Sequence, residues 1–224
     1  MSEARAEAKR AAALRAVELV RSGMVVGLGT GSTAWFAVQE IGRRLAANQL
    51  RDIVGIPTSR ATRDHGAAVG IPLGTLDDRP FVDLTIDGAD EVDPQGNLIK
   101  GHGGALLWEK IVATASRKLV IVADPSKMVP RLGSTRALPV EVVTFGWGTH
   151  LPAIRALGAE PGLRRTAHGE PVRTDEGHFI LDCQFAAGID DPTEVERVLR
   201  ARPGVVETGL FLGFRPEVII GGSG

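Results

Sequence analysis

A glycine-rich stretch near the N-terminus has the residue types needed to bind a phosphate group. Positions 27–34 read GLGTGSTA. Glycines let backbone N–H groups approach an anion, and a helix that follows such a loop presents the positive end of its dipole. Thr30, Ser32 and Thr33 would add hydroxyl donors. Taken alone, the same stretch could also be a tight turn from a strand into a capped helix.

The glycine stretch also fits the dinucleotide fingerprint G-x-G-x-x-G/A, so an NAD(P)-dependent dehydrogenase is an alternative. That fold needs an acidic residue at the end of the second strand to bind the ribose. Here the apolar run 53–57 continues into Thr58, Ser59 and Arg60. The expected carboxylate is absent, although Arg60 could face a 2′-phosphate.

An acidic stretch follows the apolar run 82–86 and reads DGADEVD at positions 87–93. Ligands of open α/β sheets bind beyond the carboxyl ends of the strands, where this stretch would lie. Four carboxylates so close together would repel one another if all were buried, so we expect Glu91 and Asp93 to face solvent. A calcium loop is an alternative, but the regular alternation of oxygen ligands is missing. An acidic turn before the segment 94–97 is the other alternative.

Two further stretches place lysines and a glutamate near the same predicted sheet edge. Lys100 precedes Gly101, His102, Gly103 and Gly104, which have little side chain to shield it from a ligand. Glu109 follows in a predicted helix over 105–115, where it could instead be a surface carboxylate beside Lys110. Lys127 follows the apolar run 119–123 and could reach a sugar oxygen, a phosphate or only solvent.

The elements that would position these residues form an α/β pattern in the first half of the chain. Ala13, Val17 and Val20 recur at helical spacing before Gly23, and a second helical pattern runs from about 32 to 45. Short apolar runs alternate with these helical stretches, as in a parallel sheet covered on both faces. We therefore expect a Rossmann-like parallel sheet. The predicted strands are 24–29, 53–56, 82–86 and 119–123.

The second half of the chain has a different spacing, typical of a small α+β domain. A strand at 140–144, a helix at 150–157, two strands around Arg164 and Phe179 and a helix at 193–199 resemble a split βαβ, or ferredoxin-like, unit. Strand-like segments at 205–206 and 217–220 suggest that the chain then returns to the first domain. The predicted domains are 1–133 plus 205–224 (Rossmann-like, catalytic) and 134–204 (small α+β).

The composition excludes several classes of function. With 26 basic and 27 acidic residues the net charge is −1, which gives no general attraction to nucleic acid or to an anionic membrane. No apolar run approaches a membrane span or a secretory signal, so we expect a cytoplasmic protein. The five histidines have no ligand-like spacing, and the lone Cys183 lies in a strand-like segment that we expect to be core. We predict no metal and no cofactor.

The motifs in their order and spacing resemble the ribose-5-phosphate isomerase type A family. The resemblance rests on GLGTGST at 27–33, DGADE at 87–91, KG at 100, EK at 109 and ADPSK at 123–127. It continues through LPVEV at 138–142 and PGVV at 203–206, so it covers nearly the whole chain. Each motif alone is modestly specific, whereas the ordered set is highly specific.

The resemblance implies a cofactor-free interconversion of ribose 5-phosphate and ribulose 5-phosphate in the pentose phosphate pathway. Glu109 matches the family's proton acceptor, Lys100 would stabilise the developing negative oxygen, and Asp87 and Asp90 would handle the sugar hydroxyls and ring opening. Lys9 would assist the phosphate loop. The remaining substrate-binding positions implied by the family are Thr30, Gly31, Ser32, Thr33, Gly88, Ala89, Gly101, His102, Gly103 and Lys127.

The chain departs from the family pattern at His102, where an uninterrupted glycine run is usual. We expect this imidazole to point into solvent, with capping of a helix end or contact with substrate as alternatives. The resemblance also implies a homodimer or homotetramer. A sugar-phosphate sensor of the kind fused to transcriptional regulators is a non-enzymatic alternative, but we find no spare N-terminal module for DNA binding.

Overall fold

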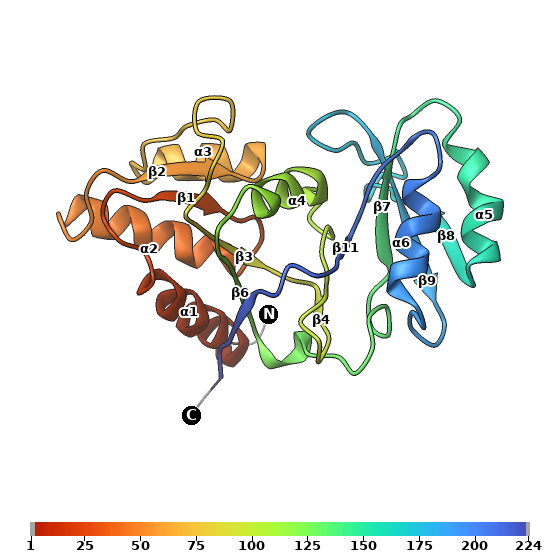
Figure 1. The fold of residues 1–224 in the computed structure, drawn as a ribbon, viewed down its shortest axis with the longest axis horizontal. Coiled ribbons are helices and arrows are strands. Elements are labelled where there is room, and N and C mark those ends of the chain that lie inside the picture. The colour runs from red at the N-terminus through yellow and green to blue at the C-terminus, as the bar shows by residue number, and fades with distance from the viewer. Residues whose placement is uncertain (1–2, 223–224) are drawn as a thin grey trace. The chain divides into compact units, whose positions relative to one another are not determined.

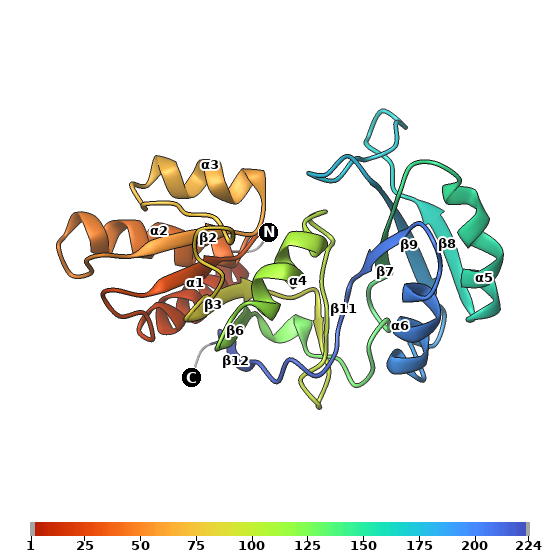
Figure 2. The same cartoon turned by 45° about the horizontal axis from the view of Figure 1, so that its top comes forward.

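The structure is a computed structural model that describes residues 3–222, and it divides into two compact units. The first unit contains the chain up to Ala89, the segment Trp108–Lys127 and the chain from Phe214 onward. The second unit contains Asp90–Leu107 and Met128–Gly213. Each unit has strands of its own (Figures 1 and 2). Each also has its own apolar core.

The first unit is built on a five-stranded sheet in the order β12-β6-β3-β1-β2, with every strand pair parallel. Its strands are rich in apolar residues, as expected of a parallel sheet whose two faces are covered by helices. All five residues of β6, LVIVA, are buried. The strands are β1 (Val25–Leu28), β2 (Val54–Pro57), β3 (Leu84–Gly88), β6 (Leu119–Ala123) and β12 (Glu217–Ile220).

Four helices accompany this sheet. The buried face of α1 and α2 packs in one apolar cluster with Val26, Ile86 and Val122, whereas Val112 of α4 packs in another with Ile56 and Val82. Figure 1 shows α1 and α2 together on one side of the strands and α4 on the other. The helices are α1 (Glu3–Val17), α2 (Ala34–Ala46), α3 (Arg60–Ala68) and α4 (Leu106–Thr114).

The second unit contains a four-stranded antiparallel sheet in the order β10-β7-β9-β8. The element order β7-α5-β8-β9-α6-β10 is the predicted split βαβ arrangement. Ile154 of α5 and Leu199 of α6 share its core with Cys183, which is buried as predicted. The elements are β7 (Leu138–Val142), α5 (Leu151–Ala156), β8 (Ala159–Leu163), β9 (Phe179–Phe185), α6 (Pro192–Arg200) and β10 (Val205–Thr208).

A three-stranded sheet in the second unit carries the segment that precedes Lys100. It has the order β11-β5-β4, and its strands are only two residues long. Such short strands give no periodic signal in the sequence, so the sequence did not predict them. They are β4 (Glu91–Val92), β5 (Leu98–Ile99) and β11 (Leu210–Phe211), and two 3₁₀ turns, η1 (Pro125–Lys127) and η2 (Trp147–His150), complete the fold.

The predicted fold class, a Rossmann-like parallel sheet with a smaller α+β part, is confirmed. The two compact units differ in part from the predicted domains in the segments that they contain. β10 pairs with β7 and supplies the last strand of the split βαβ unit, whereas β12 returns to the parallel sheet. Pairing of β11 with β5 joins the segment 90–107 to the second unit. The boundaries after residues 133 and 204 stay a prediction about independently folding domains.

Candidate active site

The glycine loop joins the end of β1 to the start of α2, as the sequence predicted. Gly31 has a φ of +114°, a conformation that a side chain would strain. Thr33 occupies the N-cap position and is buried, whereas Gly31 and Ser32 are exposed. Backbone N–H groups at the beginning of a helix of this length form a site for an anion.

Four hydroxyl side chains fasten the glycine loop to the beginning of α3. Thr30 Oγ1 lies 2.8 Å from Thr58 Oγ1, 2.8 Å from Ser59 Oγ and 3.0 Å from Thr62 Oγ1. Ser59 also caps α3 by accepting a hydrogen bond from the Thr62 N–H. Sequence reasoning missed these partners. The signal was the pair of hydroxyls directly after the second strand, which ends at the same sheet edge as the first.

Lys9 of α1 adds a positive charge to the loop. Its Nζ donates to Ser32 Oγ at 2.7 Å, and the lysine is 6% exposed. The spacing of apolar residues in the first helix gave no signal for this contact, whereas the family resemblance implied that Lys9 assists the loop. A lysine ammonium group on the loop that precedes the α2 N-terminus favours a bound dianion.

Asp87 connects the glycine loop to β3. Its Oδ1 accepts from the Thr30 N–H at 3.1 Å and from the Gly88 N–H at 2.7 Å, and the residue is 1% exposed. A Cβ on Gly29 would lie 2.5 Å from the Asp87 Cα, so this close approach of the backbones requires glycine. Asp87 is therefore fixed at the carboxyl edge of the sheet, where the sequence placed it.

The loop forms one wall of a pocket of about 460 Å³ in the first unit. Trp35 stacks on His65 there, with ring centroids 5.2 Å apart. Burial lowers the pKa of His65 and so favours its neutral ring. The pocket is lined by Gly29, Thr30, Gly31, Ser32, Trp35, Phe36, Ala61, Thr62 and His65.

Glu109 lies in the first turn of α4 and is 5% exposed, so it is not the surface carboxylate of the alternative interpretation. Val112, one turn later, packs against Gly27 of β1. A Cβ added to Gly27 would lie only 2.9 Å from Val112 Cγ1. The end of α4 returns to the start of β3, where Val82 N–H donates to Ala115 O. α4 therefore runs against the strands. Its Glu109 lies about 4.5 Å beyond Val112 toward the carboxyl edge of the sheet, on the same helix face.

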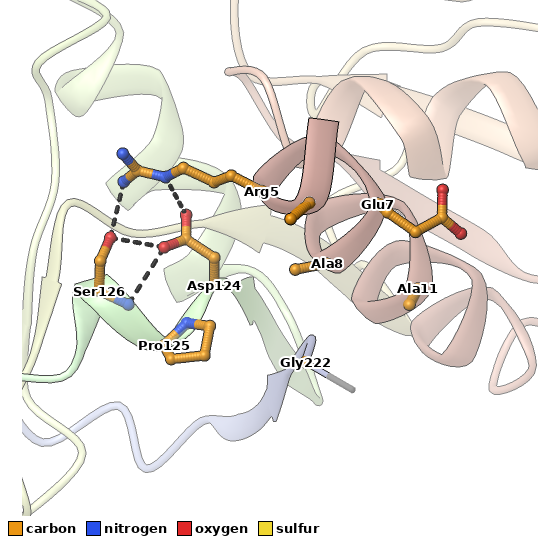
Figure 3. A pocket seen from close by; sticks show the side chains of 9 residues that line it. Arg5, Glu7, Ala8, Ala11, Asp124, Pro125, Ser126 and Gly222 are labelled. Carbon is orange, nitrogen blue, oxygen red and sulfur yellow. Dashed lines mark hydrogen bonds and ion pairs between the residues drawn. The ribbon is translucent and has the colours of Figure 1, made fainter. Parts of the chain in front are cut away.

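An ion pair ties α1 to the turn that holds Lys127. Arg5 Nε lies 3.1 Å from Asp124 Oδ2, and the Arg5 guanidinium also donates to Ser126 Oγ (Figure 3). Burial opposes ionisation of Asp124, but hydrogen bonds from Ser126 and Arg5 outweigh it and lower its pKa. Lys127 is the last residue of η1 and is half-buried. Arg5 therefore steadies both α1, which carries Lys9, and the start of η1.

In the second unit, Lys100 is held at both ends. Its backbone N–H donates to Gly209 O at 2.9 Å, and its Nζ lies 5.6 Å from the centroid of the Phe211 ring. The residue is 3% exposed. The chain turns directly after it, with φ values of +105° at Gly101 and +81° at Gly104 that glycine adopts without strain.

His102 contradicts the expectation of a solvent-facing imidazole. The residue is half-buried, and its Nε2 lies 3.0 Å from Ala137 O. The backbone N–H of His102 donates to Asp90 Oδ2 at 3.0 Å. The expectation was wrong because the Ala137 carbonyl group lies within hydrogen-bonding distance of the ring and stabilises it in this orientation. Asp90 and the glycine stretch after Lys100 are thus in direct contact.

The expectation that Glu91 and Asp93 face solvent was also wrong. Glu91 is fully buried, and its carboxylate accepts from backbone N–H groups of Gly133, Thr135 and Arg136. Asp93 is 7% exposed and accepts from the N–H groups of the turn over 95–97. Repulsion among the carboxylates is avoided because backbone donors compensate each one separately.

The acidic stretch 87–93 contains the end of β3 and strand β4, so it is not simply an acidic turn, and the turn follows it at 94–96. Within residues 3–222, no group of three or more His, Cys, Asp or Glu side chains is arranged to hold a metal ion. No helix in the same range is both long and apolar enough to cross a membrane.

The predicted site residues thus fall into two sets. The first unit holds Thr30, Gly31, Ser32, Thr33, Asp87, Gly88, Ala89, Glu109 and Lys127, and the second holds Asp90, Lys100, Gly101, His102 and Gly103.

Comparisons with known proteins agree with the motifs. The family model of ribose 5-phosphate isomerase A (phosphoriboisomerase A) matches residues 54–224. The chain is 52% identical to ribose-5-phosphate isomerase A of Synechococcus sp. (strain JA-3-3Ab), over 96% of this chain and 94% of the relative. It is 54% identical to ribose-5-phosphate isomerase A of Gloeobacter violaceus, over 96% and 93% of the two chains.

Solved structures are similar over the same extent. A D-ribose-5-phosphate isomerase in complex with phospho-erythronic acid superposes with a TM-score of 0.93 at 37% identity, covering 96% of this chain and 94% of that one. Ribose 5-phosphate isomerase A of Methanocaldococcus jannaschii gives 0.89 at 39% identity, with the same coverage of both chains. Sequence and fold agree along nearly the whole length. The chain therefore belongs to the ribose 5-phosphate isomerase A family of enzymes.

Proposed function

We propose that this enzyme interconverts D-ribose 5-phosphate and D-ribulose 5-phosphate through a cis-enediol, in the non-oxidative branch of the pentose phosphate pathway. The observation that carries the proposal is the buried Glu109 in the first turn of α4. This turn lies toward the carboxyl edge of the parallel sheet, where the glycine loop also lies. Family membership supports the same reaction.

The phosphate group binds to the loop Thr30–Thr33 with help from Lys9. The loop offers backbone N–H groups at a helix N-terminus, and Lys9 Nζ lies on Ser32. Binding of the phosphate group aligns the sugar carbons with the catalytic groups before the chemical step. This alignment reduces the entropy lost in that step. Asp87 and Asp90 contact the sugar hydroxyls and assist ring opening.

Glu109 moves the proton. In the open-chain aldose its carboxylate removes the proton from C2, and negative charge develops on the oxygen of the C1 carbonyl. The O2 proton passes to O1, and Glu109 returns its proton to C1 to give the ketose. A positioned base contributes a rate factor of about 10² to 10⁴.

Lys100 stabilises the negative oxygen of the enediolate. It is a buried ammonium group followed by a backbone turn with little side chain. Donors that are already aimed at the developing charge often contribute more than the base itself. Gly88, Ala89, Gly101, His102, Gly103 and Lys127 complete the proposed contacts with the substrate.

The dehydrogenase alternative has less support. The ribose-binding carboxylate that it requires after β2 is replaced by Thr58 and Ser59, whose hydroxyls contact Thr30. The reaction that we propose needs no hydride carrier and no metal. We also propose a cytoplasmic homodimer or homotetramer. Light scattering at micromolar concentration would test the oligomer, and a monomer would contradict it.

The decisive experiment follows ketose formation from ribose 5-phosphate without added metal, for the wild type and for Glu109→Gln. This substitution keeps the shape and removes the base, so kcat should fall by about 10² to 10⁴. Glu194→Gln is the matched control, because Glu194 also lies in the first turn of a nine-residue helix but is exposed. An inactive wild type would contradict the proposed function. Near-wild-type kcat in Glu109→Gln would remove Glu109 from its role.

A further inference from the structure

Arg164, directly after β8, binds the turn that follows Lys100. Its Nη1 donates to Gly101 O at 3.0 Å and to His102 O at 3.1 Å. Two successive carbonyl groups of one turn are thus held by a single guanidinium nitrogen. All three residues belong to the second unit, so the contact lies within one compact part of the chain.

Asp182 of β9 fixes the orientation of Arg164. Arg164 Nε donates to Asp182 Oδ2 at 2.9 Å, and Arg164 Nη2 donates to the other carboxylate oxygen. The side chains are 14% and 31% exposed. A two-point pair of this kind sets the plane of the guanidinium and leaves Nη1 aimed at the turn.

The geometry of the peptide bond transmits this orientation to the N–H groups of the turn. In a planar trans peptide the C=O and the next N–H point in opposite directions. Because the Gly101 carbonyl faces Arg164, the His102 N–H faces away from it, where it donates to Asp90 Oδ2. By the same rule the Gly103 N–H faces away from Arg164, and Gly103 is exposed.

We propose that Arg164 is a positioning residue for the isomerisation: through Gly101 and His102 it holds the Gly103 N–H and Lys100 in the direction that opposes the developing oxyanion. This inference rests on the proposed function. Glycine has the largest conformational freedom of any residue, so a turn of this composition needs external bonds to keep one conformation. Arg164 supplies two of them without touching the substrate.

The role of Arg164 concerns the reacting end of the substrate and not its phosphate end. Loss of Arg164 should disturb donors that act on the reacting carbons and leave the phosphate loop, in the other unit, intact. We therefore expect a lower kcat and weaker binding of phospho-erythronic acid, whose carboxylate imitates the charged enediolate. Inhibition by inorganic phosphate should not change, since inorganic phosphate tests only binding at the phosphate loop.

The experiment compares the wild type, Arg164→Gln and Arg165→Gln in kcat, KM and inhibition constants for the two ligands. Arg165 is the matched control, because it is the next residue but is exposed, and its side chain donates to Gly169 O, which is also exposed. For Arg164→Gln we expect kcat to fall by roughly ten- to a hundredfold and the phospho-erythronic acid constant to rise by about tenfold or more. For Arg165→Gln both should stay within about twofold of the wild type.

The outcomes separate this inference from the proposed function. Equal kcat and equal phospho-erythronic acid inhibition in the two variants, with an active wild type, would overturn the role of Arg164 alone. An equal loss of affinity for phosphate and phospho-erythronic acid would also overturn it, because that pattern indicates general loosening. If Arg164→Gln does not fold, Arg164→Lys decides the question. Lysine keeps the positive charge but loses the planar guanidinium that bonds Asp182 and the turn at once. This variant should also bind phospho-erythronic acid more weakly and phosphate unchanged.

Discussion

The loop after β1 and the turn after β5 are both rich in glycine, yet different kinds of groups hold them. The Thr30 side chain in the first loop contacts the neutral hydroxyls of Thr58, Ser59 and Thr62, whereas the charged group that accepts from its backbone N–H is Asp87. The turn over 101–104 is held by charged groups, with Arg164 on its carbonyls and Asp90 on one of its N–H groups. Each loop is thus fixed by partners from its own unit.

The difference matches what each loop would bind. The hydroxyls around Thr30 add no charge to the first loop, and Lys9, which donates to Ser32, adds a positive charge beside the helix N-terminus, as a phosphate dianion would require. The second loop would oppose a charge that appears only during the reaction, and charge-assisted hydrogen bonds are about twice as strong as neutral ones. The comparison suggests that the first loop serves substrate binding and the second serves the rate of the chemical step.

The most severe way to break the first loop is Gly29→Ala. A Cβ at this position would lie 2.3 Å from Asp87 Oδ1 and 2.5 Å from Asp87 Cα, and the backbone contact cannot be relieved by moving one side chain. We expect kcat/KM to fall about a hundredfold or more because both the loop and Asp87 are displaced. Steady-state kinetics together with thermal unfolding would measure this.

Gly148→Ala is the control for that substitution. A Cβ there meets nothing within 4 Å, and the residue has no positive φ, so the variant should behave like the wild type. Unchanged kcat/KM in Gly29→Ala would show that the close contact between β1 and β3 does not position the loop.

The smallest effect is expected from Arg5→Gln, which cuts the ion pair that steadies α1. Arg5 is 40% exposed, so at pH 7 the loss in free energy of unfolding should be no more than about 1 kcal/mol. The folded-state pKa of Asp124 lies below its ordinary value of 3.8. The stabilisation is therefore complete above that value and disappears as pH falls below it through the folded-state pKa.

Urea unfolding of the wild type and Arg5→Gln at pH 7 and near pH 3 would test the sign. The difference between the two proteins should shrink at the lower pH. Arg63→Gln, which removes an exposed pair with Asp64, should show no measurable difference at either pH. A difference for Arg5→Gln that grows with acid would contradict the assigned direction.

Much of the fold could be predicted because its signals are local. The apolar run 119–123 and the GLGTGSTA stretch at 27–34 specify a buried strand and a strand-to-helix loop without any long-range information. The strands β4, β5 and β11 could not be predicted, since each is only two residues long and β11 pairs with β5 across more than a hundred residues.

The same distinction applies to the site. The types and order of Asp87, Lys100 and Glu109 were visible in the sequence, but the groups that hold them were not. Glu91 was misassigned to solvent because its backbone partners come from the distant segment 133–136. Arg164 contacts Gly101 across more than sixty residues, and nothing in its local sequence distinguishes it from Arg165.

The most direct test of this division of labour measures Lys9→Met and Lys100→Met side by side with ribose 5-phosphate. Loss of Lys9 should raise KM by about tenfold with little change in kcat, whereas loss of Lys100 should lower kcat by about a hundredfold or more with little change in KM. If both variants raised KM alike and kept kcat, the two loops would share a single binding role, and the account would be contradicted.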